Sequence, residues 1–275
     1  MEGEEDPSLA RRGLAAATEV ARREGLKFDA PAILRDRGNL LLHLRPAPVV
    51  ARVATLTGTR RAGDDWLRRE VSLAGFLASA GLPVVAPSGE LDPGPHTEDG
   101  ISLSFWEYVK EVDGPLDAGA AGRALRACHE ALVEFPGDLE PLATLTEAER
   151  WLAELHEEGR IATAVAARLE DEAAAVRERI AMLDEPLQAV HGDAHLDNVI
   201  QTAAGPLWND WEDTCLGPRA LDLGCMEAAA SVFGDDPGPV AAALAAYGEV
   251  DPEALATFVA ARRFQGTIWS FLLEP

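Results

Sequence analysis

The apolar pattern of this chain changes from strand-like to helical near residues 108–114, and this change limits the possible folds more than any other feature. Before it, residues 40–44 and 49–54 form Leu-rich and Val-rich runs separated by Pro46 and Pro48, which predicts a hairpin. After it, apolar residues recur at helical spacing. Helices are expected at 118–134, 146–157 and 161–183, with three more between 219 and 273. The pattern predicts an α+β protein with an N-terminal antiparallel hairpin and a mainly helical C-terminal part.

The N-terminal part contains further elements that place two charged residues. Helices are predicted at 9–24 and 64–80, strands at 82–86 and 101–109, and a polar loop at 89–100. Arg52 stands in the second hairpin strand. At about 100° per residue, Glu70 falls beside the apolar stripe of the 64–80 helix. Glu70 could therefore reach a buried cation on the neighbouring sheet.

The length and charge of the chain limit its partners. With 275 residues it can form one large domain or two lobes that share a cleft, a natural place for a small-molecule site. The net charge of −23, from 47 acidic and 24 basic residues, should repel nucleic acids and favour a cationic substrate. Alternatively the acidic excess only solvates outer faces, as in the helix expected at 161–183.

The cysteines and the N-terminus indicate a cytoplasmic protein. Three cysteines, Cys128, Cys215 and Cys225, form no CxxC pair, so neither a disulfide framework nor a zinc ribbon is indicated. Residues 1–6 are acidic and lack an apolar signal region, and no run approaches the roughly 18 apolar residues of a membrane span. We expect no membrane partner, and the sequence makes no prediction of oligomeric state.

The most specific motif is the octapeptide HGDAHLDN that begins at His191, followed by Asp210. Four residues separate Asp193 from Asn198. In kinase-type phosphoryl transfer, this spacing lets one carboxylate face the attacking hydroxyl while the Asn and a later Asp hold the metal ion on the nucleotide phosphates. Asp193 would be the general base or orienting group, and Asn198 and Asp210 would supply oxygen ligands suited to Mg²⁺.

Phosphoryl transfer also needs a cation for the α- and β-phosphates. Arg52 and Glu70 have the order and spacing of the kinase ion pair that performs this task. Taken alone, Arg52 would more often be an ordinary surface residue of a strand. No GxxxxGK followed by Ser or Thr occurs in the sequence, so a Walker-type phosphate loop is excluded.

Simpler explanations exist for the individual polar residues. Asp and Asn are common in turns, and Asp222 fits equally well as a helix-start residue or as a brace for the catalytic loop. A sharper alternative is a binuclear metallohydrolase whose metal ligands are the alternating residues His191, Asp193, His195 and Asp197. The joint occurrence of all the motif residues in one order favours kinase-type chemistry.

The motif residues resemble those of the aminoglycoside phosphotransferase and choline kinase group, whose members share the protein-kinase-like fold. The matching signature comprises His191-Gly192-Asp193, Asn198, Asp210-Trp211-Glu212 and residues 217–223. Similar counterparts also exist for Arg69-Glu70, residues 77–83, the helix at 122–129 and residues 265–272. The resemblance therefore covers most of the chain.

The resemblance implies a bilobal fold with a small N-terminal lobe on an antiparallel sheet and a larger, mainly helical C-terminal lobe. Residues 1–109 would be the nucleotide-binding lobe, ending in a hinge whose backbone meets the base, and 110–275 the lobe with the catalytic loop and substrate site. The residues implied are Asp193 and His191 for catalysis, Asn198 and Asp210 for Mg²⁺, Asp222 as structural support, Arg52 and Glu70 for the phosphates, and Phe105, Trp106, Glu107 and Tyr108 for the hinge.

Two departures from the family pattern affect the nucleotide site. Arg52 stands where Lys is commoner, and its planar fork binds phosphate with a different geometry. The loop near Gly38 and Asn39 lacks a kinase GxGxxG sequence.

Together these features predict an enzyme that transfers the γ-phosphoryl group of ATP, with GTP possible, to a hydroxyl of a small molecule. The first acceptor expected is an aminoglycoside or related amino sugar, as in antibiotic resistance, with Glu212 and Glu227 contacting its cationic groups. Choline-like, sugar, amino-acid and macrolide acceptors are alternatives. A different class of hypothesis is a protein that binds a nucleotide or metabolite without catalysis.

Overall fold

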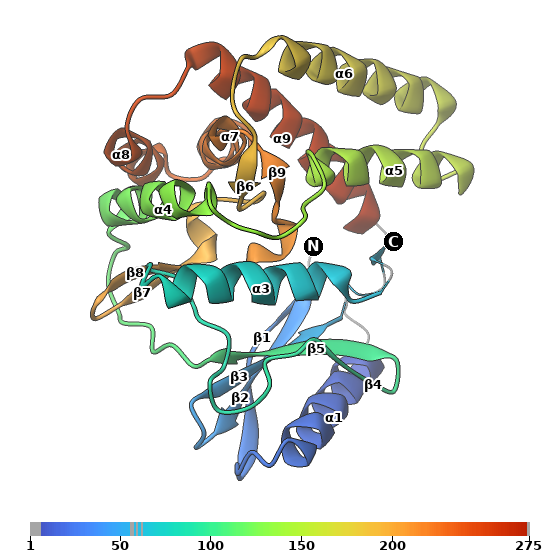
Figure 1. The fold of residues 1–275 in the computed structure, drawn as a ribbon. Coiled ribbons are helices and arrows are strands. Elements are labelled where there is room, and N and C mark those ends of the chain that lie inside the picture. Colours follow the sequence, from blue (N-terminus) through green and yellow to red (C-terminus); the bar gives the residue numbers. More distant parts are fainter. Residues whose placement is uncertain (1–6, 56–57, 59, 62, 274–275) are drawn as a thin grey trace. The chain divides into compact units, whose positions relative to one another are not determined.

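The computed structural model describes residues 7–55, 58, 60–61 and 63–273. Residues 1–6, on which the cytoplasmic prediction partly rests, lie outside these ranges. The chain divides into two compact units, Met1–Val112 and Asp113–Pro275. Each unit is described by itself, with its elements labelled in Figure 1.

The first unit contains a five-stranded antiparallel sheet in the order β1-β2-β3-β5-β4. Helices α1 and α3 accompany it (Figure 1). The bounds of the elements are α1 Pro7–Arg23, β1 Ala30–Arg37, β2 Asn39–Arg45, β3 Val49–Ala54, α3 Asp65–Ser79, β4 His96–Glu98 and β5 Ile101–Glu107.

Alternating apolar residues of the predicted hairpin make the core of this unit. Leu40, Leu42 and Leu44 of β2 are completely buried, and they belong to one apolar cluster with Ala17 and Val20 of α1. Side chains on alternate strand positions share one face, so a single run of Leu buries one side of β2. This part of the fold follows directly from the sequence pattern.

Two predictions for the first unit are wrong, and one strand was missed. Residues 82–86 are not a strand but an irregular segment, since Pro83 lies in it and Pro87 follows, and proline cannot donate to a strand ladder. The predicted loop at 89–100 contains β4. The missed strand is β1, whose Ile33 and Leu34 are exposed, so its sequence lacks the alternation of a half-buried strand.

The second unit is mainly helical, with two small two-stranded sheets, β6 with β9 and β7 with β8. All the helices predicted after residue 115 are present with small shifts at their ends. The bounds of the elements are α4 Ala118–Leu132, α5 Ala143–Glu157, α6 Thr163–Met182, β6 Gln188–Val190, η1 Leu196–Asn198, β7 Val199–Thr202, β8 Gly205–Trp208, η2 Trp211–Asp213, β9 Cys215–Gly217, α7 Arg219–Ser231, α8 Pro237–Tyr247 and α9 Pro252–Leu273.

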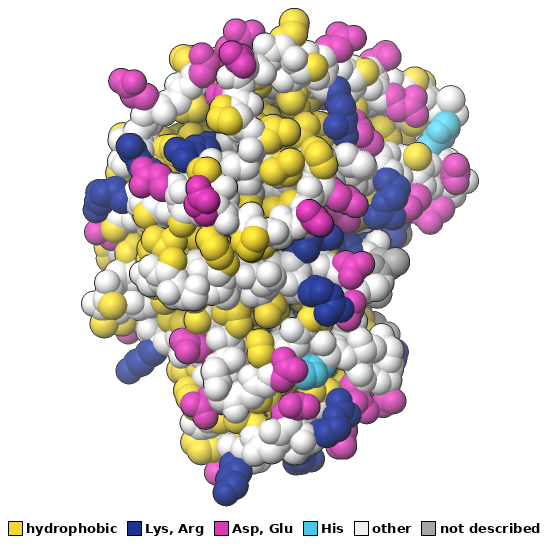
Figure 2. Space-filling model, in the orientation of Figure 1, with side chains coloured by type: hydrophobic (Ala, Val, Ile, Leu, Met, Phe, Trp, Pro, Cys, Tyr) yellow, Lys and Arg dark blue, Asp and Glu magenta, His cyan; other side chains and the backbone are white. Residues whose placement is uncertain are grey.

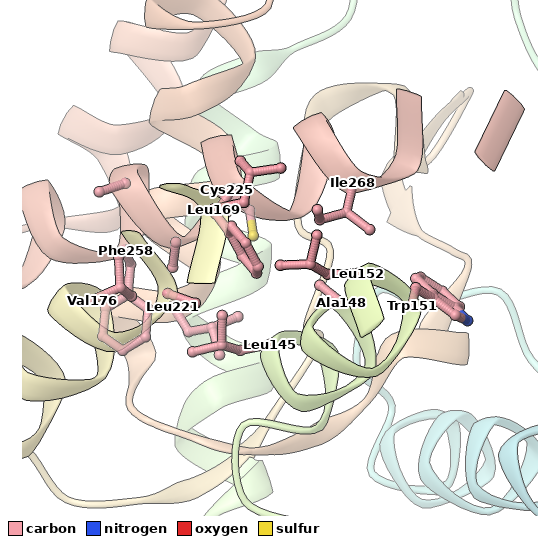
Figure 3. Packing of buried hydrophobic residues seen from close by; sticks show 14 of the residues in the cluster. Leu145, Ala148, Trp151, Leu152, Leu169, Val176, Leu221, Cys225, Phe258 and Ile268 are labelled. Carbon is pink, nitrogen blue, oxygen red and sulfur yellow. The ribbon is translucent and has the colours of Figure 1, made fainter. Parts of the chain in front are cut away.

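Helices α5, α6, α7 and α9 enclose the main apolar cluster of the second unit (Figure 3). Leu145, Leu169, Leu221 and Ile268 are examples from the four helices. Helices α7 and α9 approach closely at Gly224, where a Cβ atom would lie 2.5 Å from the Cβ of Phe258. A side chain there would push the helices apart, so the spacing of α9 from α7 depends on this glycine.

The acidic excess and the three cysteines of the sequence can now be located in the structure. On the face drawn in Figure 2, Asp and Glu side chains are dispersed and alternate with Lys and Arg, as on a solvated acidic surface. Cys128, Cys215 and Cys225 are all buried free thiols. Among the described residues, no helix combines the length and the apolar character that a membrane span requires.

Candidate active site

The loop of residues 191–198 leaves β6 and carries the predicted catalytic Asp193 in the second unit. Gly192 has a φ of +87°, and a Cβ atom on it would lie 1.9 Å from the carbonyl oxygen of Asp213. Both the backbone angle and the close approach exclude any other residue there. The glycine of the motif therefore allows the loop to pass directly against the segment that carries η2.

Asp222, in the first turn of α7, braces this loop. Its side chain is completely buried and accepts hydrogen bonds from the backbone N–H groups of His191 and Gly192, each at 2.8 Å. It also accepts a 2.8 Å bond from Nε2 of His129 on α4, whose Nδ1 lies 2.8 Å from the hydroxyl of Tyr247. Of the two explanations offered for Asp222, the brace is the one these contacts support.

Asp193 lies partly exposed, with 20% of its side chain accessible. Its Oδ1 forms an ion pair with Arg262 of α9, and its Oδ2 lies 3.5 Å from Nε2 of His195. Burial alone would raise the pKa of Asp193, but the Arg262 guanidinium and His195 outweigh burial and hold this pKa well below its usual range. Asp193 is therefore ionised and ready to accept a hydrogen bond.

The same contacts act on the two cations. Burial would lower the pKa of His195, yet the hydrogen bond to Asp193 raises it overall, and Asp193 likewise raises the pKa of Arg262 against the effect of burial. Arg262 could not be predicted from the sequence, because 69 positions separate it from Asp193 and it belongs to no motif. Only the packing of α9 brings it here.

Asn198 and Asp210 are brought together by the antiparallel pairing of β7 with β8. The backbone oxygen of Asn198 accepts a 2.9 Å bond from the N–H of Asn209, the neighbour of Asp210. The Nδ2 of Asn198 donates to the backbone oxygen of Asp193 at 2.9 Å, which orients the amide so that its oxygen faces elsewhere. An amide oxygen and a carboxylate form a donor set that fits a hard divalent cation such as Mg²⁺.

Asp210 itself adopts a left-handed backbone conformation, with φ 65° and ψ 57°. Such a conformation is uncommon outside glycine, although Asp and Asn tolerate it best. The turn directs the chain from β8 into η2.

His191 is completely buried, so the structure does not support its predicted catalytic role. Its Nε2 donates to the carbonyl oxygen of Asn209 at 3.0 Å, and its Nδ1 lies 3.4 Å from the backbone nitrogen of Asp193. Its ring packs against Trp211 and Trp208, with centroids 4.4 and 5.5 Å away. The ring therefore links the loop of Asp193 to the residues that precede η2.

These contacts disfavour the metallohydrolase alternative. Both ring nitrogens of His191 face protein groups, and Asp193 is paired with Arg262, a cation that would repel a metal ion. Within the described residues, no group of three or more His, Cys, Asp and Glu side chains is arranged to hold a metal ion.

In the first unit, Arg52 and Glu70 form the predicted ion pair. Arg52 lies on β3 between its ladder partners Leu41 of β2 and Ser104 of β5, and Glu70 lies on α3. Both side chains are almost completely buried, and Nη1 of Arg52 donates to Oε1 of Glu70. A buried charge is retained only when it is paired, so α3 and the sheet are tied together at this point.

The predicted hinge lies at the end of β5. The amide groups of Phe105, Glu107 and Tyr108 each donate to a carbonyl oxygen of the first unit at 2.9 Å. The side chains of Phe105 and Trp106 are buried, and the ring of Tyr108 stacks on His43 with centroids 3.7 Å apart. A nucleotide base bound here would therefore use other backbone groups of the 105–109 stretch.

The loop near Gly38 and Asn39 is a tight turn between β1 and β2. Gly38 has a φ of +67°, which glycine adopts without strain, and its carbonyl oxygen accepts a 2.8 Å bond from Oγ1 of Thr55. The turn lacks the GxGxxG sequence with which protein kinases cover the phosphates.

The two candidate substrate residues lie near the predicted metal and brace residues in sequence. Glu212 is in η2, two positions after Asp210, and Glu227 is in α7, five positions after Asp222. Both are partly exposed. Contact between these two residues and a substrate stays a prediction.

Comparison with solved structures identifies the fold. A crystal structure of an aminoglycoside-3'-phosphotransferase of type VIII has a TM-score of 0.67 and 21% identity, over 92% of this chain and 98% of that one. The choline kinase LicA from Streptococcus pneumoniae has a TM-score of 0.68 and 15% identity, over 93% and 90%. An amicoumacin kinase solved with AMP-PNP and Ca²⁺ has a TM-score of 0.67 and 13% identity, over 93% and 87%. The fold is the protein-kinase-like one of such enzymes.

The family is shown by the sequence itself. A family model described as the Phosphotransferase enzyme family matches residues 20–258. The chain belongs to this family and is a phosphotransferase, as its motif predicted. No curated protein matches it.

Proposed function

We propose that the protein transfers the γ-phosphoryl group of ATP to a hydroxyl group of a small molecule. The observation that carries the proposal is the arrangement around Asp193 in the second unit. This carboxylate lies partly exposed on a loop braced by Asp222, with Asn198 and Asp210 at the near end of one hairpin. The amicoumacin kinase solved with a nucleotide and a divalent cation supports the choice of cofactors.

Each residue then has a defined task. Asp193 accepts a hydrogen bond from the acceptor hydroxyl and directs the oxygen toward phosphorus. Asn198 and Asp210 would hold Mg²⁺, which neutralises charge on the phosphates of the nucleotide. Arg52, held by Glu70, would bind the α- and β-phosphates through its guanidinium fork. Asp222 and His191 keep the catalytic loop in place.

We propose an amino sugar such as an aminoglycoside as the first acceptor to test. The net charge of −23 and the partly exposed Glu212 and Glu227 favour a cationic molecule. Proteins of this fold include both the aminoglycoside phosphotransferase and the choline kinase compared above. Choline-like, sugar, amino-acid and macrolide acceptors therefore belong in the same screen, and an antibiotic-resistance role follows only from an antibiotic acceptor.

The test is an acceptor screen with ATP and Mg²⁺, measured as ADP release above the rate without acceptor. In the best reaction, Asp193→Asn should lower kcat by about 10²–10⁴-fold, the usual contribution of a positioned acid or base. Asp197→Asn is the matched control, because Asp197 is exposed in the same loop and loses the same charge. Near-normal turnover by Asp193→Asn would refute the assignment. Binding of ATP without stimulated turnover by any acceptor would favour a non-catalytic protein.

A further inference from the structure

We propose that Arg262 of α9 is a positioning residue of the phosphoryl-transfer site. Its guanidinium holds Oδ1 of Asp193, so that Oδ2 is presented to the acceptor hydroxyl. The inference rests on the proposed function and extends the site to the last helix of the chain.

The packing of α9 sets the position of Arg262. Phe258 lies against Gly224 of α7 at a distance that only glycine permits, and Arg262 follows Phe258 by four residues on the same face of the helix. One turn further on, Nε2 of Gln265 donates to Oγ1 of Thr144 at 2.9 Å. Contacts on both sides of Arg262 therefore hold it beside the catalytic loop.

The environment of Arg262 differs from that of its neighbour Arg263. The Arg262 side chain is 23% exposed and meets a carboxylate that is 20% exposed, whereas Arg263 is 55% exposed and pairs with Glu172 at 2.6 Å. Exposed pairs contribute little, but a largely buried guanidinium needs its partner. Arg263 is thus a control on the same helix with the same charge.

The carboxylate of Asp193 needs such a partner because its terminal torsion is soft. Rotation about χ2 of Asp is broad, so the backbone alone does not orient the two oxygens. With Oδ1 held by Arg262, Oδ2 points toward His195, whose Nε2 lies 3.5 Å from it. In the transfer, the acceptor oxygen forms its bond to phosphorus as the bond to ADP breaks. The hydroxyl proton leaves through Oδ2, and Arg262 keeps its own protons.

The experiment compares Arg262→Met, Arg262→Lys and Arg263→Met with the parent enzyme, using the acceptor found by the screen. Misplacing a catalytic group by about 1 Å costs about 10²-fold, so Arg262→Met should lower kcat by about 10–100-fold. KM for ATP should change less than about twofold, because Arg262 does not bind the nucleotide in this scheme. Arg262→Lys should recover part of kcat, and Arg263→Met should retain it.

Two further measurements separate positioning from folding. Added guanidinium ion should raise kcat of Arg262→Ala more than ammonium ion at the same concentration does, because the planar fork matches a carboxylate better than a point charge does. In the Asp193→Asn background, Arg262→Met should cause no further loss, since the two residues act through one carboxylate.

Several results would overturn the inference. Arg262→Met with kcat within about twofold of the parent excludes it, as does an equal loss in Arg263→Met. If Arg262→Met does not fold, two other results count against the inference. One is a folded Arg262→Lys with the kcat of the parent enzyme, and the other is an Arg262→Ala that guanidinium ion does not rescue. A large loss in Asp193→Asn beside normal Arg262 variants refutes only the role of Arg262. Normal activity in Asp193→Asn refutes the catalytic assignment of Asp193, and with it this inference. Absence of acceptor-stimulated ADP release with every acceptor refutes the proposed function.

Discussion

Replacement of Asp222 by Asn tests how the catalytic loop is held. Oδ1 of Asp222 accepts the N–H of Gly192, while Oδ2 accepts both the N–H of His191 and Nε2–H of His129. In the Asp222→Asn variant, one of these two oxygens is replaced by an NH₂ group. Whichever way the amide turns, at least one buried backbone N–H then faces another donor.

The cost can be worked out from these contacts. One unsatisfied buried donor costs about 1–3 kcal/mol, and the remaining bonds lose the strengthening that a charged acceptor provides. We therefore expect Asp222→Asn to reduce the free energy of unfolding by about 2–4 kcal/mol. If the amide places NH₂ toward His129, that ring can change tautomer and donate to Tyr247 instead, so the loss should lie near the lower end.

The assay combines urea unfolding with steady-state kinetics. Loss of the brace should displace Asp193 and lower kcat by about 100-fold, a loss that remains at temperatures where the variant is fully folded. Asp197→Asn, in the exposed part of the same loop, should leave both quantities near the parent values. The reasoning is refuted if Asp222→Asn unfolds at the parent urea concentration and turns over normally.

Two other predictions concern Gly192 and the ion pair of the first unit. Gly192→Ala should abolish activity and severely destabilise the second unit, because its methyl group would lie 1.9 Å from the carbonyl oxygen of Asp213. Gly205→Ala is the control, because Gly205 also has a positive φ, +122°, but has open space around it, so that only backbone strain and no steric overlap results. Equal losses of stability in both variants would contradict this explanation. Arg52→Met should lower the free energy of unfolding by about 3–5 kcal/mol, since it leaves Glu70 as a buried charge without this partner. The same variant should weaken ATP binding in calorimetry, with Arg52→Lys less affected, and unchanged affinity would remove Arg52 from the nucleotide site.

The elements that could be predicted are those whose side chains alternate between buried and exposed positions. Strand β2 and the helices of the second unit have this periodicity, because one face of each is buried. Strand β3 is buried at nearly every position and is predicted from its run of Val and Ala residues instead. Strand β1 could not be found in this way. Its apolar Ile33 and Leu34 are exposed, and its place in the sheet comes from backbone hydrogen bonds to β2, which leave no mark on side-chain identity.

The candidate site also contains residues whose placement could be predicted and residues whose placement could not. Asp193, Asn198 and Asp210 lie close together in the sequence, and a loop followed by a hairpin brings such neighbours together by local geometry alone. Their proximity could therefore be predicted from order and spacing, and their roles stay a prediction. The complete burial of His191 could not be predicted, because residue type and position do not reveal burial.

The sequence by itself determined the class of fold, the phosphotransferase motif and the pairing of Arg52 with Glu70 as a candidate. Only the tertiary structure decided that Asp222 and His129 together brace the loop, and that Arg262 reaches Asp193 from α9. These contacts join residues separated by 93 and 69 positions. They depend on how helices pack, including one close approach at Gly224, and packing is a property of the whole core that no local pattern encodes.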